Sequence, residues 1–414
     1  MTREPFTDRN FRPPNDLAER LRHVDVPEAA AAEERGWRVV SAAAAERNAA
    51  RAGSRRRRWR APRPAAVAAA ALAALVLLAL TPPGGAVADW VRDTIGRSAP
   101  PASVTAHDTL GSLPGGGRLL VQSPAGVWVV RPDGSRRLLG RYDEATWSPR
   151  GLFIGVTNRD GLMAVTPGGQ VRWALARPGA ESPRWSPSGF RVAYRRHGDL
   201  RVVAGDGTGD KLLARDLGLV APAWQPAFKL HTLAAANRRG RVVLIDADSG
   251  QRLWRSQPGA HPLSLAWAAD GQRLLAVTPH SLRLFDGFGR ELVRQPLPAG
   301  AVAGPAAFAP RGREFALVRR LPRAGGDEVV QMRASRAVLG ERLVFRGAGR
   351  LGGLAWSPDG RWLGIAWPSA DQWLFVRPGS RAAPRAAAGI ARQFDPGAKG
   401  PAPAPALAGW CCPQ

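Results

Sequence analysis

The stretch that decides the fold is Ala355-Trp356-Ser357-Pro358-Asp359-Gly360, because weaker copies of it recur along the C-terminal two-thirds of the chain. In most copies an aromatic residue is followed by a short turn that contains Pro, Gly or both. The aromatic residues are Trp147, Trp185, Trp224, Trp267, Phe308, Trp356 and Phe394, with spacings of 38, 39, 43, 41, 48 and 38 residues. A repeat of roughly 40–45 residues with strand-like contents is typical of a β-propeller, with one blade for each copy.

Each copy has a mechanical interpretation as the end of one strand and the start of the next. The aromatic side chain is large enough to wedge between neighbouring blades. Pro has no N–H to donate and stops ladder pairing, and Gly accepts a positive φ in the turn. The next strand follows at once, as in Arg361–Ala366. The pattern therefore predicts a packing role for the Trp residues, and a ligand-stacking surface is the alternative.

The first blade has no aromatic copy before it and needs a strand from elsewhere. Its own three strands are expected at Arg118–Gln122, Val127–Val130 and Arg136–Leu139. We expect Ile390–Phe394 to pair with them from the C-terminal side, which removes the open edges of the array. The prediction is an all-β, seven-bladed propeller over residues 118–397 that is closed by a C-terminal strand. Six or eight blades are the alternatives, because the sixth repeat carries an insertion at Arg320–Asp327.

The composition is strongly basic, with 59 Lys and Arg against 33 Asp and Glu and a formal net charge of +26. Only Lys211, Lys229 and Lys399 are lysines, which indicates a high-GC coding bias as well as charge. The excess favours anionic partners. No helix-turn-helix, zinc-finger spacing or basic strand with interleaved aromatic residues points to nucleic acid.

The N-terminal third predicts a membrane anchor. Residues 1–64 form an Arg-rich, partly helical tail, which is either solvated or a docking segment for a cytoplasmic partner. Ala65–Leu80 contains no polar side chain and follows the basic run Arg55–Arg60, so residues 65–81 are expected to span the membrane once. The positive-inside rule places the N-terminus in the cytoplasm and the propeller outside. Residues 82–117 are expected to form a juxtamembrane helix and a linker.

A cleaved signal peptide is the alternative to this anchor. A basic region, an apolar run and Ala86-Val87-Ala88 before Asp89 together resemble a signal with a small-residue cleavage site after Ala88. The leader before the apolar run is much longer than an ordinary signal. Both interpretations export the propeller.

The two cysteines of the chain, Cys411 and Cys412, lie in a Pro- and Ala-rich stretch. We expect residues 398–414 to be a disordered tail, with the cysteines either unpaired or joined to another molecule by an intermolecular disulfide. On this interpretation the folded body holds no disulfide framework and no Cys-based metal site.

The Trp-Ser-Pro-Asp-Gly copies resemble those of the TolB-type, WD-repeat-like propellers of bacterial envelope proteins, over roughly residues 118–397. The Gly-His and Trp-Asp dipeptides of WD repeats are missing. Ile245–Trp254 also looks like a blade of quinoprotein-type propellers, but their adjacent cysteines lie near the cofactor, whereas Cys411 and Cys412 fall outside the predicted blades. The arrangement of tail, span and propeller resembles anti-sigma-like membrane proteins of high-GC bacteria, although His23 stands alone where a zinc-binding pattern would be.

Side chains that could carry catalysis have simpler roles. Four acidic residues stand in turn contexts: Asp206, Asp270, Asp286 and Asp359. The glycine-rich Gly205–Gly209 leads into no helix and so lacks the dipole of a phosphate cradle. The six histidines show no metal-ligand spacing, and no Gly-x-Ser-x-Gly elbow occurs. We therefore assign no catalytic, cofactor-binding or metal-binding residue and expect no enzyme.

These observations predict a non-catalytic, membrane-tethered module that binds or senses outside the cytoplasm. The partner would be a protein or an anionic envelope polymer, held by Arg, Trp and Phe at the ends of the ring, including Arg320–Asp327. The alternatives are an anti-sigma-like signalling protein whose tail has a cytoplasmic partner, and a quinoprotein-like enzyme that uses a quinone or a metal.

Overall fold

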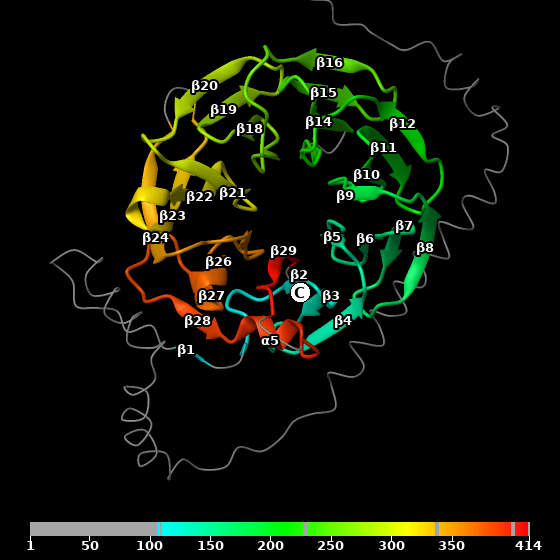
Figure 1. Ribbon diagram of the computed structural model, residues 1–414. Helices are drawn as coiled ribbons and strands as arrows, with labels where there is room; N and C mark the ends of the chain where they lie inside the picture. The colour runs from blue at the N-terminus through cyan, green and yellow to red at the C-terminus, as the bar shows by residue number, and fades with distance from the viewer. Residues whose placement is uncertain (1–105, 108–109, 227–230, 336–338, 399–401, 413–414) are drawn as a thin grey trace, which may run out of the picture. The chain divides into compact units, whose positions relative to one another are not determined.

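The computed structural model describes residues 106–107, 110–226, 231–335, 339–398 and 402–412. These residues form seven sheets arranged as the blades of a ring (Figure 1). The seven-bladed, all-β propeller predicted from the repeats is thus confirmed. The predicted tail, membrane span, juxtamembrane helix and cleavage site lie outside the described residues.

The blades, each given from its innermost to its outermost strand, are as follows. Blade 1 is β29 (Ala406–Cys411), β2 (Arg118–Ser123), β3 (Gly126–Val130) and β4 (Arg136–Gly140), and blade 2 is β5 (Glu144–Trp147), β6 (Ile154–Asn158), β7 (Gly161–Val165) and β8 (Val171–Ala176). Blade 3 is β9 (Ala180–Trp185), β10 (Arg191–Arg196), β11 (Asp199–Ala204) and β12 (Lys211–Ala214), and blade 4 is β13 (Ala223–Trp224), β14 (Thr232–Ala236), β15 (Val242–Asp246) and β16 (Arg252–Arg255).

The remaining three blades complete the ring. Blade 5 is β17 (Ser264–Trp267), β18 (Arg273–Val277), β19 (Ser281–Asp286) and β20 (Glu291–Pro296), and blade 6 is β21 (Val302–Phe308), β22 (Glu314–Leu321), β23 (Gly326–Arg333) and β24 (Glu341–Ala348). Blade 7 is β25 (Leu354–Trp356), β26 (Leu363–Trp367), β27 (Gln372–Val376) and β28 (Arg385–Ala388), with β1 (Ala106–His107) pairing in parallel with β28. The short helices are η1 (Pro322–Ala324), η2 (Pro368–Ala370) and α5 (Ile390–Phe394).

Burial explains why the middle strands are almost wholly apolar. Both faces of each blade pack against neighbouring blades, so β3, β14 and β18 are buried at every position, as expected for strands covered on both sides. Outermost strands such as β8 and β16 lie at the rim, where most of their residues are exposed and none is buried. The described apolar side chains form seven clusters, and each cluster lies between two neighbouring blades. The core is therefore a closed circuit of interfaces.

Ring closure by a C-terminal strand is confirmed, but the strand is not the predicted one. Ile390–Phe394 is helix α5, and its Phe394 ring packs against Trp128 and Trp373 with centroids 5.6 and 5.0 Å away. The closing strand is β29, which pairs antiparallel with β2 so that Trp410 lies opposite Leu119. The structure therefore corrects the prediction that the propeller ends at residue 397 and that residues 398–414 are disordered: Ala406–Cys411 forms the inner strand of blade 1.

The predicted linker over residues 82–117 also ends earlier than expected. Ala106–His107 adds β1 to the rim of blade 7. Leu110 and Leu113 are buried in the apolar cluster between blades 7 and 1. The segment that leads into β2 is thus part of the packed domain.

The wedge role predicted for the repeated Trp residues is confirmed and has a hydrogen-bonding component. In three blades the indole N–H of the motif Trp donates to the carbonyl of the residue before the motif aromatic of the preceding blade, whereas the indoles of Trp147 and Trp185 have no hydrogen-bond partner among the described residues. The bonds run from Trp224 to Arg184 (2.9 Å), from Trp267 to Ala223 (3.2 Å) and from Trp356 to Ala307 (2.9 Å). The same side chain thus fills the apolar interface and ties neighbouring inner strands together.

The insertion in the sixth repeat lengthens a hairpin and adds no blade. β22 and β23 each have 8 residues, and Arg320 pairs with Asp327 just before η1 turns the chain. Within the strands, Arg319 binds Glu328 and Glu341. Extra residues are thus absorbed within one sheet.

Removing β29 should open the ring. Truncation after Ala404 takes away Leu407 and Trp410, and truncating one buried Trp alone costs about 3–5 kcal/mol. We expect the free energy of unfolding to fall by about 5 kcal/mol or more, measured by denaturant unfolding. Removal of Pro413 and Gln414 alone is the control and should change little. Equal stability of both truncations and the intact chain would contradict closure by β29.

The hydrogen-bonded Trp residues offer a matched test. Trp224 and Trp185 are buried to a similar extent, but the Trp185 indole N–H has no hydrogen-bond partner among the described residues. Trp224→Phe strands a buried carbonyl and should cost about 1–2 kcal/mol more than Trp185→Phe. Thermal and denaturant unfolding of the two variants measure the difference. Equal losses would show that the bond between blades contributes nothing.

Candidate functional site

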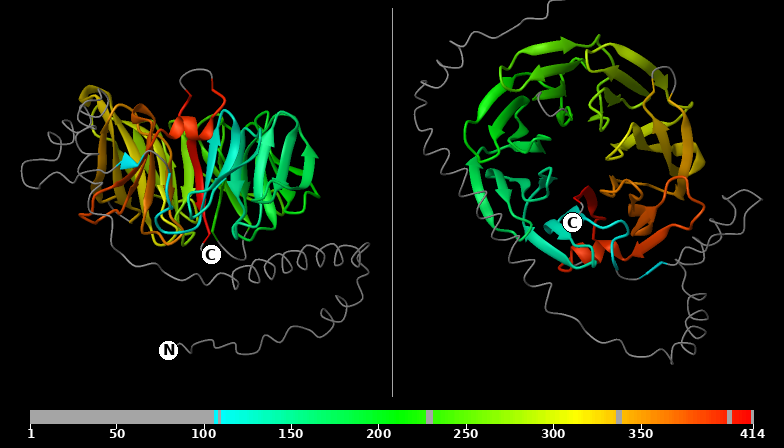
Figure 2. Two further views of the ribbon diagram at one scale, coloured as in Figure 1. Left: turned by 90° about the horizontal axis from the view of Figure 1, so that it is seen from below. Right: turned by 180° about the vertical axis from the view of Figure 1, so that it is seen from behind.

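The strand order gives the ring two distinct ends. One end carries the connections from first to second and from third to fourth strands; we name it the turn face, because the Trp-Ser-Pro turns lie there. The other end, the loop face, carries the connections from second to third strands and from blade to blade. Figure 2 shows α5 at the loop face and β29 running towards the turn face.

The acidic residues predicted to serve turns do so, and all four lie on the turn face. Asp206 accepts the Thr208 amide, and Asp270 accepts the Gln272 amide. Asp286 accepts two amides of its turn, and Asp359 accepts the amide two residues further on. Burial opposes ionisation of Asp359 and Asp270, but hydrogen bonds to the charged form, from the Ser357 hydroxyl to Asp359 and from the Gln272 amide to Asp270, together with neighbouring Arg residues keep the pKa of each below its usual value. Their carboxylates are thus occupied by local structure.

Other charges on the turn face are paired between blades. Arg313 binds Asp270 at 2.5 Å across the interface of blades 5 and 6. Asp248 of blade 4 binds Arg191 of blade 3 and lies 2.7 Å from the ring of His231. Arg191 and Arg313 are therefore each neutralised by an Asp of a neighbouring blade.

The loop face carries an arginine cluster that lacks such neutralisation. It consists of Arg215, Arg238, Arg239 and Arg255, all exposed. Among the described residues, none of the four guanidinium groups makes an ion pair. We call this set the loop-face arginine cluster. These residues were not among the predicted sites, although the Asn237–Gly240 sequence between two strands predicts a turn at the centre of the cluster.

Backbone contacts bring the loops of this cluster together over blades 3 and 4. The Leu217 amide donates to the Gly198 carbonyl, and the Arg238 amide donates to the Asp216 carbonyl at 3.4 Å. A methyl group at Gly198 would meet the Arg238 guanidinium at 3.1 Å. Arg196 and the exposed His197 extend the basic surface, and Asp199 and Asp216 are the acidic residues nearest in the chain.

Exposed apolar side chains accompany the cluster. Leu219 is 88% exposed in the connection from blade 3 to blade 4, and its carbonyl is held by the buried Arg195 at 2.5 Å. Leu263 is 51% exposed in the connection from blade 4 to blade 5. A large exposed apolar side chain on a backbone held by Arg195, in the same loops as the arginine cluster, is suited to contact with a partner.

A pocket on the turn face is the second candidate. It has a volume of about 430 Å³ at the outer part of blade 5 and is lined by Gln272, Arg273, Asp286, Gly287, Phe288, Arg290, Glu291 and Leu292. Phe288 is 88% exposed at its edge. Ligand pockets are usually mostly apolar with a few convergent polar groups, whereas charged and polar side chains dominate this lining. Asp286 and Glu291 are already bonded to their own turn and to Arg283.

The raised pKa of Tyr194 belongs to a buried network and marks no open site. Burial, with help from Asp210, raises the pKa of Tyr194 to about 12. Hydrogen bonds from Arg201, Tyr194 and Arg177 keep the pKa of Asp210 below its usual range although burial opposes them. Shifted pKa values often mark functional sites, but Tyr194 is fully buried. Its polar groups serve packing within blade 3.

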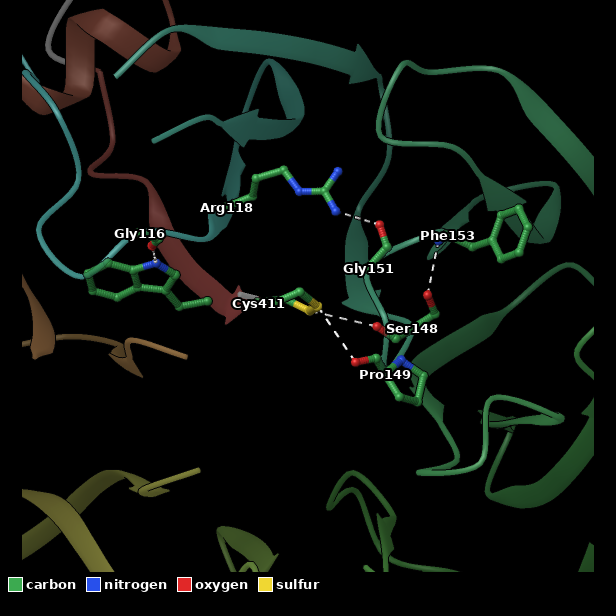
Figure 3. The surroundings of a disulfide bond; sticks show 9 residues. Gly116, Arg118, Ser148, Pro149, Gly151, Phe153 and Cys411 are labelled. Carbon is green, nitrogen blue, oxygen red and sulfur yellow. Dashed lines mark hydrogen bonds between the residues drawn. A yellow bond between two sulfur atoms is a disulfide. The ribbon is translucent and has the colours of Figure 1, made fainter. Parts of the chain in front are cut away.

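The cysteine pair lies at the end of β29 in blade 1, and not in a disordered tail as predicted. Cys411 and Cys412 form a disulfide with each other at the end of β29. The expectations of unpaired cysteines or an intermolecular bond, and of cysteines outside the blades, are therefore wrong. Figure 3 shows the sulfurs facing the carbonyls of Ser148 (3.8 Å) and Pro149 (3.6 Å) in blade 2.

Around the disulfide, blades 1 and 2 are joined by side chains of both. The Arg118 guanidinium donates to the Gly151 carbonyl at 2.7 Å and lies over the Trp147 ring. The Trp410 indole donates to the Gly116 carbonyl at 2.8 Å. The end of β29 is thus held from both sides. The missed signal was Trp410-Cys411-Cys412-Pro413, a distorted copy of the Trp-Ser-Pro turn.

Within the described part of the chain, no three His, Cys, Asp or Glu side chains are grouped in a way that could hold a metal ion. His197, His261 and His280 are exposed and far apart in sequence. No helix within the described ranges combines the length and the hydropathy needed to cross a membrane. The predicted span at 65–81 lies outside them.

Comparison with known proteins finds similarity to solved structures only. No protein-family model and no curated protein sequence matches this chain. Its fold is similar to Kuenenia stuttgartiensis hydrazine synthase (16% identity, TM-score 0.46, covering 56% of this chain and 76% of that chain). It is also similar to the Myceliophteria thermophila Cps50 (Swd1) β-propeller domain (14%, 0.48, 60% and 86%) and to a putative TolB from Agrobacterium tumefaciens (15%, 0.41, 59% and 95%). The likeness concerns the fold alone, so we take function from this chain's own surfaces.

Proposed function

We propose that this chain is a non-catalytic binding or sensing module, tethered to the cell membrane through residues 65–81, with its propeller outside the cytoplasm. The loop-face arginine cluster beside Leu219 is the observation that supports binding. Unpaired Arg around an apolar side chain attracts acidic surfaces and is enriched in protein interfaces. The partner is therefore acidic, either a protein surface or an anionic envelope polymer.

The proposed tether is supported by the sequence alone. Ala65–Leu80 is uninterrupted by polar side chains, and six residues before it, Arg55–Arg60, contain five Arg. This distribution favours a single span with a cytoplasmic N-terminus. A tail of 64 residues on that side also supports the alternative function, an anti-sigma-like signalling protein that holds a cytoplasmic partner through its tail.

Charge reversal on the loop face tests the binding surface. We expect Arg215→Glu, Arg238→Glu and Arg239→Glu together to weaken binding to polyglutamate or polyphosphate about tenfold or more at low salt, since the unpaired charges attract the polymer. The same variant should lose protein crosslinks in the native envelope. Binding of the unaltered protein should also weaken as salt increases.

A control with the same change in charge separates this surface from the general basicity of the chain. The control variant combines Arg131→Glu, Arg311→Glu and Arg361→Glu, which replace exposed residues on the turn face. If both triple variants bind equally weakly, the loop face has no special role. A stoichiometric redox cofactor in the purified protein would instead support the quinoprotein-like alternative.

The topology is tested with reporter fusions. A reporter placed before Arg55 should be active only in the cytoplasm, and one placed after Ser103, before the packed segment begins, only outside it. The mass of the mature protein distinguishes an anchor from a signal peptide. A mature N-terminus at Asp89 would overturn the tether and leave the propeller exported but free.

A further inference from the structure

The disulfide lies in blade 1, the blade whose first and second strands are not consecutive in the chain. In blades 2 to 7 the first and second strands are consecutive in the chain. In blade 1 the first strand is the C-terminal strand β29, whereas the second strand, β2, begins at Arg118. Cys411 and Cys412 thus lie where other blades have Ser148-Pro149 or Ser357-Pro358. We call this place the closure seam.

A disulfide between neighbouring residues stabilises the folded state little. The stabilisation that a disulfide gives by restricting the unfolded chain grows with the length of the loop that it closes. Cys411 and Cys412 are adjacent, so the bond closes the shortest loop that a chain allows. The bond also links no second strand or blade. Its effects are therefore local to the end of β29.

The disulfide holds Cys412 in a backbone conformation that an unbonded residue would avoid. Cys412 has a φ of 73°, in the left-handed region that residues other than Gly rarely occupy. On the blade 2 side its sulfur is confined, because a methyl group at Gly151 would meet it at 2.8 Å. If the bond is broken, the sulfurs must separate to van der Waals contact. Cys412 can then only move away from blade 2, and its backbone can relax.

The surroundings of Cys412 also favour exchange with external thiols. Both cysteines are partly exposed on the turn face. A methyl group at Gly151 would meet Arg118 Nη2 at 2.7 Å, so the guanidinium and the Cys412 sulfur share the same small space. A nearby cation stabilises a thiolate, and a stabilised thiolate leaves more easily in thiol–disulfide exchange.

We propose that Cys411–Cys412 is a reversible thiol–disulfide exchange site whose state sets how firmly β29 is held at the closure seam. The thiolate of a dithiol reductant attacks Cys411 Sγ, the S–S bond breaks, and its electron pair leaves on Cys412 Sγ beside Arg118. The second thiol of the reductant then attacks the mixed disulfide and releases Cys411. Both thiolates take up protons, and the dithiol becomes a disulfide. The inference rests on the closure seam and is independent of the proposed partner.

Redox titration of the full-length protein tests the exchange. The protein is equilibrated with reduced and oxidised dithiothreitol in varied ratio, alkylated, and its mass measured. We expect two thiols to appear together in one reversible, monomeric step. Two free thiols in the air-oxidised protein, or a bond that persists in excess dithiol, would overturn the proposal.

Carboxypeptidase digestion, read by mass, tests the consequence for β29. The oxidised protein should lose only Pro413 and Gln414, whereas the reduced protein should be trimmed into β29 several-fold faster. Cys411→Ser with Cys412→Ser is the matched control, and its trimming should be fast and identical in both buffers. Equal trimming of the oxidised and reduced natural protein would refute control of the closure seam.

The role of Arg118 in positioning and charge has its own measurement. Arg118→Lys keeps a cation beside Cys412, whereas Arg118→Gln removes it. We expect reduction by dithiothreitol to slow several-fold in the Gln variant and to stay near the natural rate in the Lys variant. Equal rates in the two variants would remove Arg118 from the mechanism.

Discussion

The pairing of β29 with β2 is the interaction on which the rest of the structure depends. Each blade buries both faces against its neighbours, so the apolar clusters form a circuit that is complete only when blade 1 has four strands. β29 brings Leu407 and Trp410 into the interface of blades 7 and 1. Without it, β2 would present an unpaired edge, which is a site for aggregation. The fold is therefore sensitive to events at the extreme C-terminus.

Local patterns predicted the blades because every blade repeats one mechanical solution. A large aromatic residue ends the inner strand, packs between blades and, where it is Trp, can bond to the preceding strand, as Trp224, Trp267 and Trp356 do. The seventh copy was misassigned because Phe394-Asp395-Pro396-Gly397 has the same local signal as a true turn. The closing strand is instead the one that contains Trp410, because it pairs with β2, almost 300 residues away in the chain. Local sequence does not contain information on such a distant pairing.

The binding surface could not be predicted from sequence for a related reason. An Arg is available to a partner only if no acid reaches it, and the acids that neutralise Arg are far away along the chain. Asp270 reaches Arg313 across 43 residues, whereas Arg238 and Arg239 find no carboxylate among the described residues. Similarly, the position of Cys411 and Cys412 in the fold depends on the pairing of β29 with β2, which the local sequence does not show. The loop face thus carries a cluster of Arg without carboxylate partners among the described residues, and the closure seam in blade 1 carries the disulfide.

Hydrogen exchange of the native, oxidised protein tests closure by β29 most directly. The account predicts that the amides of Ala406–Trp410 that pair with β2 are protected to the same degree as those of the other inner strands, such as Glu144–Trp147 and Ser264–Trp267. Exchange of Ala406–Trp410 at the rate of an unstructured peptide, while the other inner strands stay protected, would contradict it.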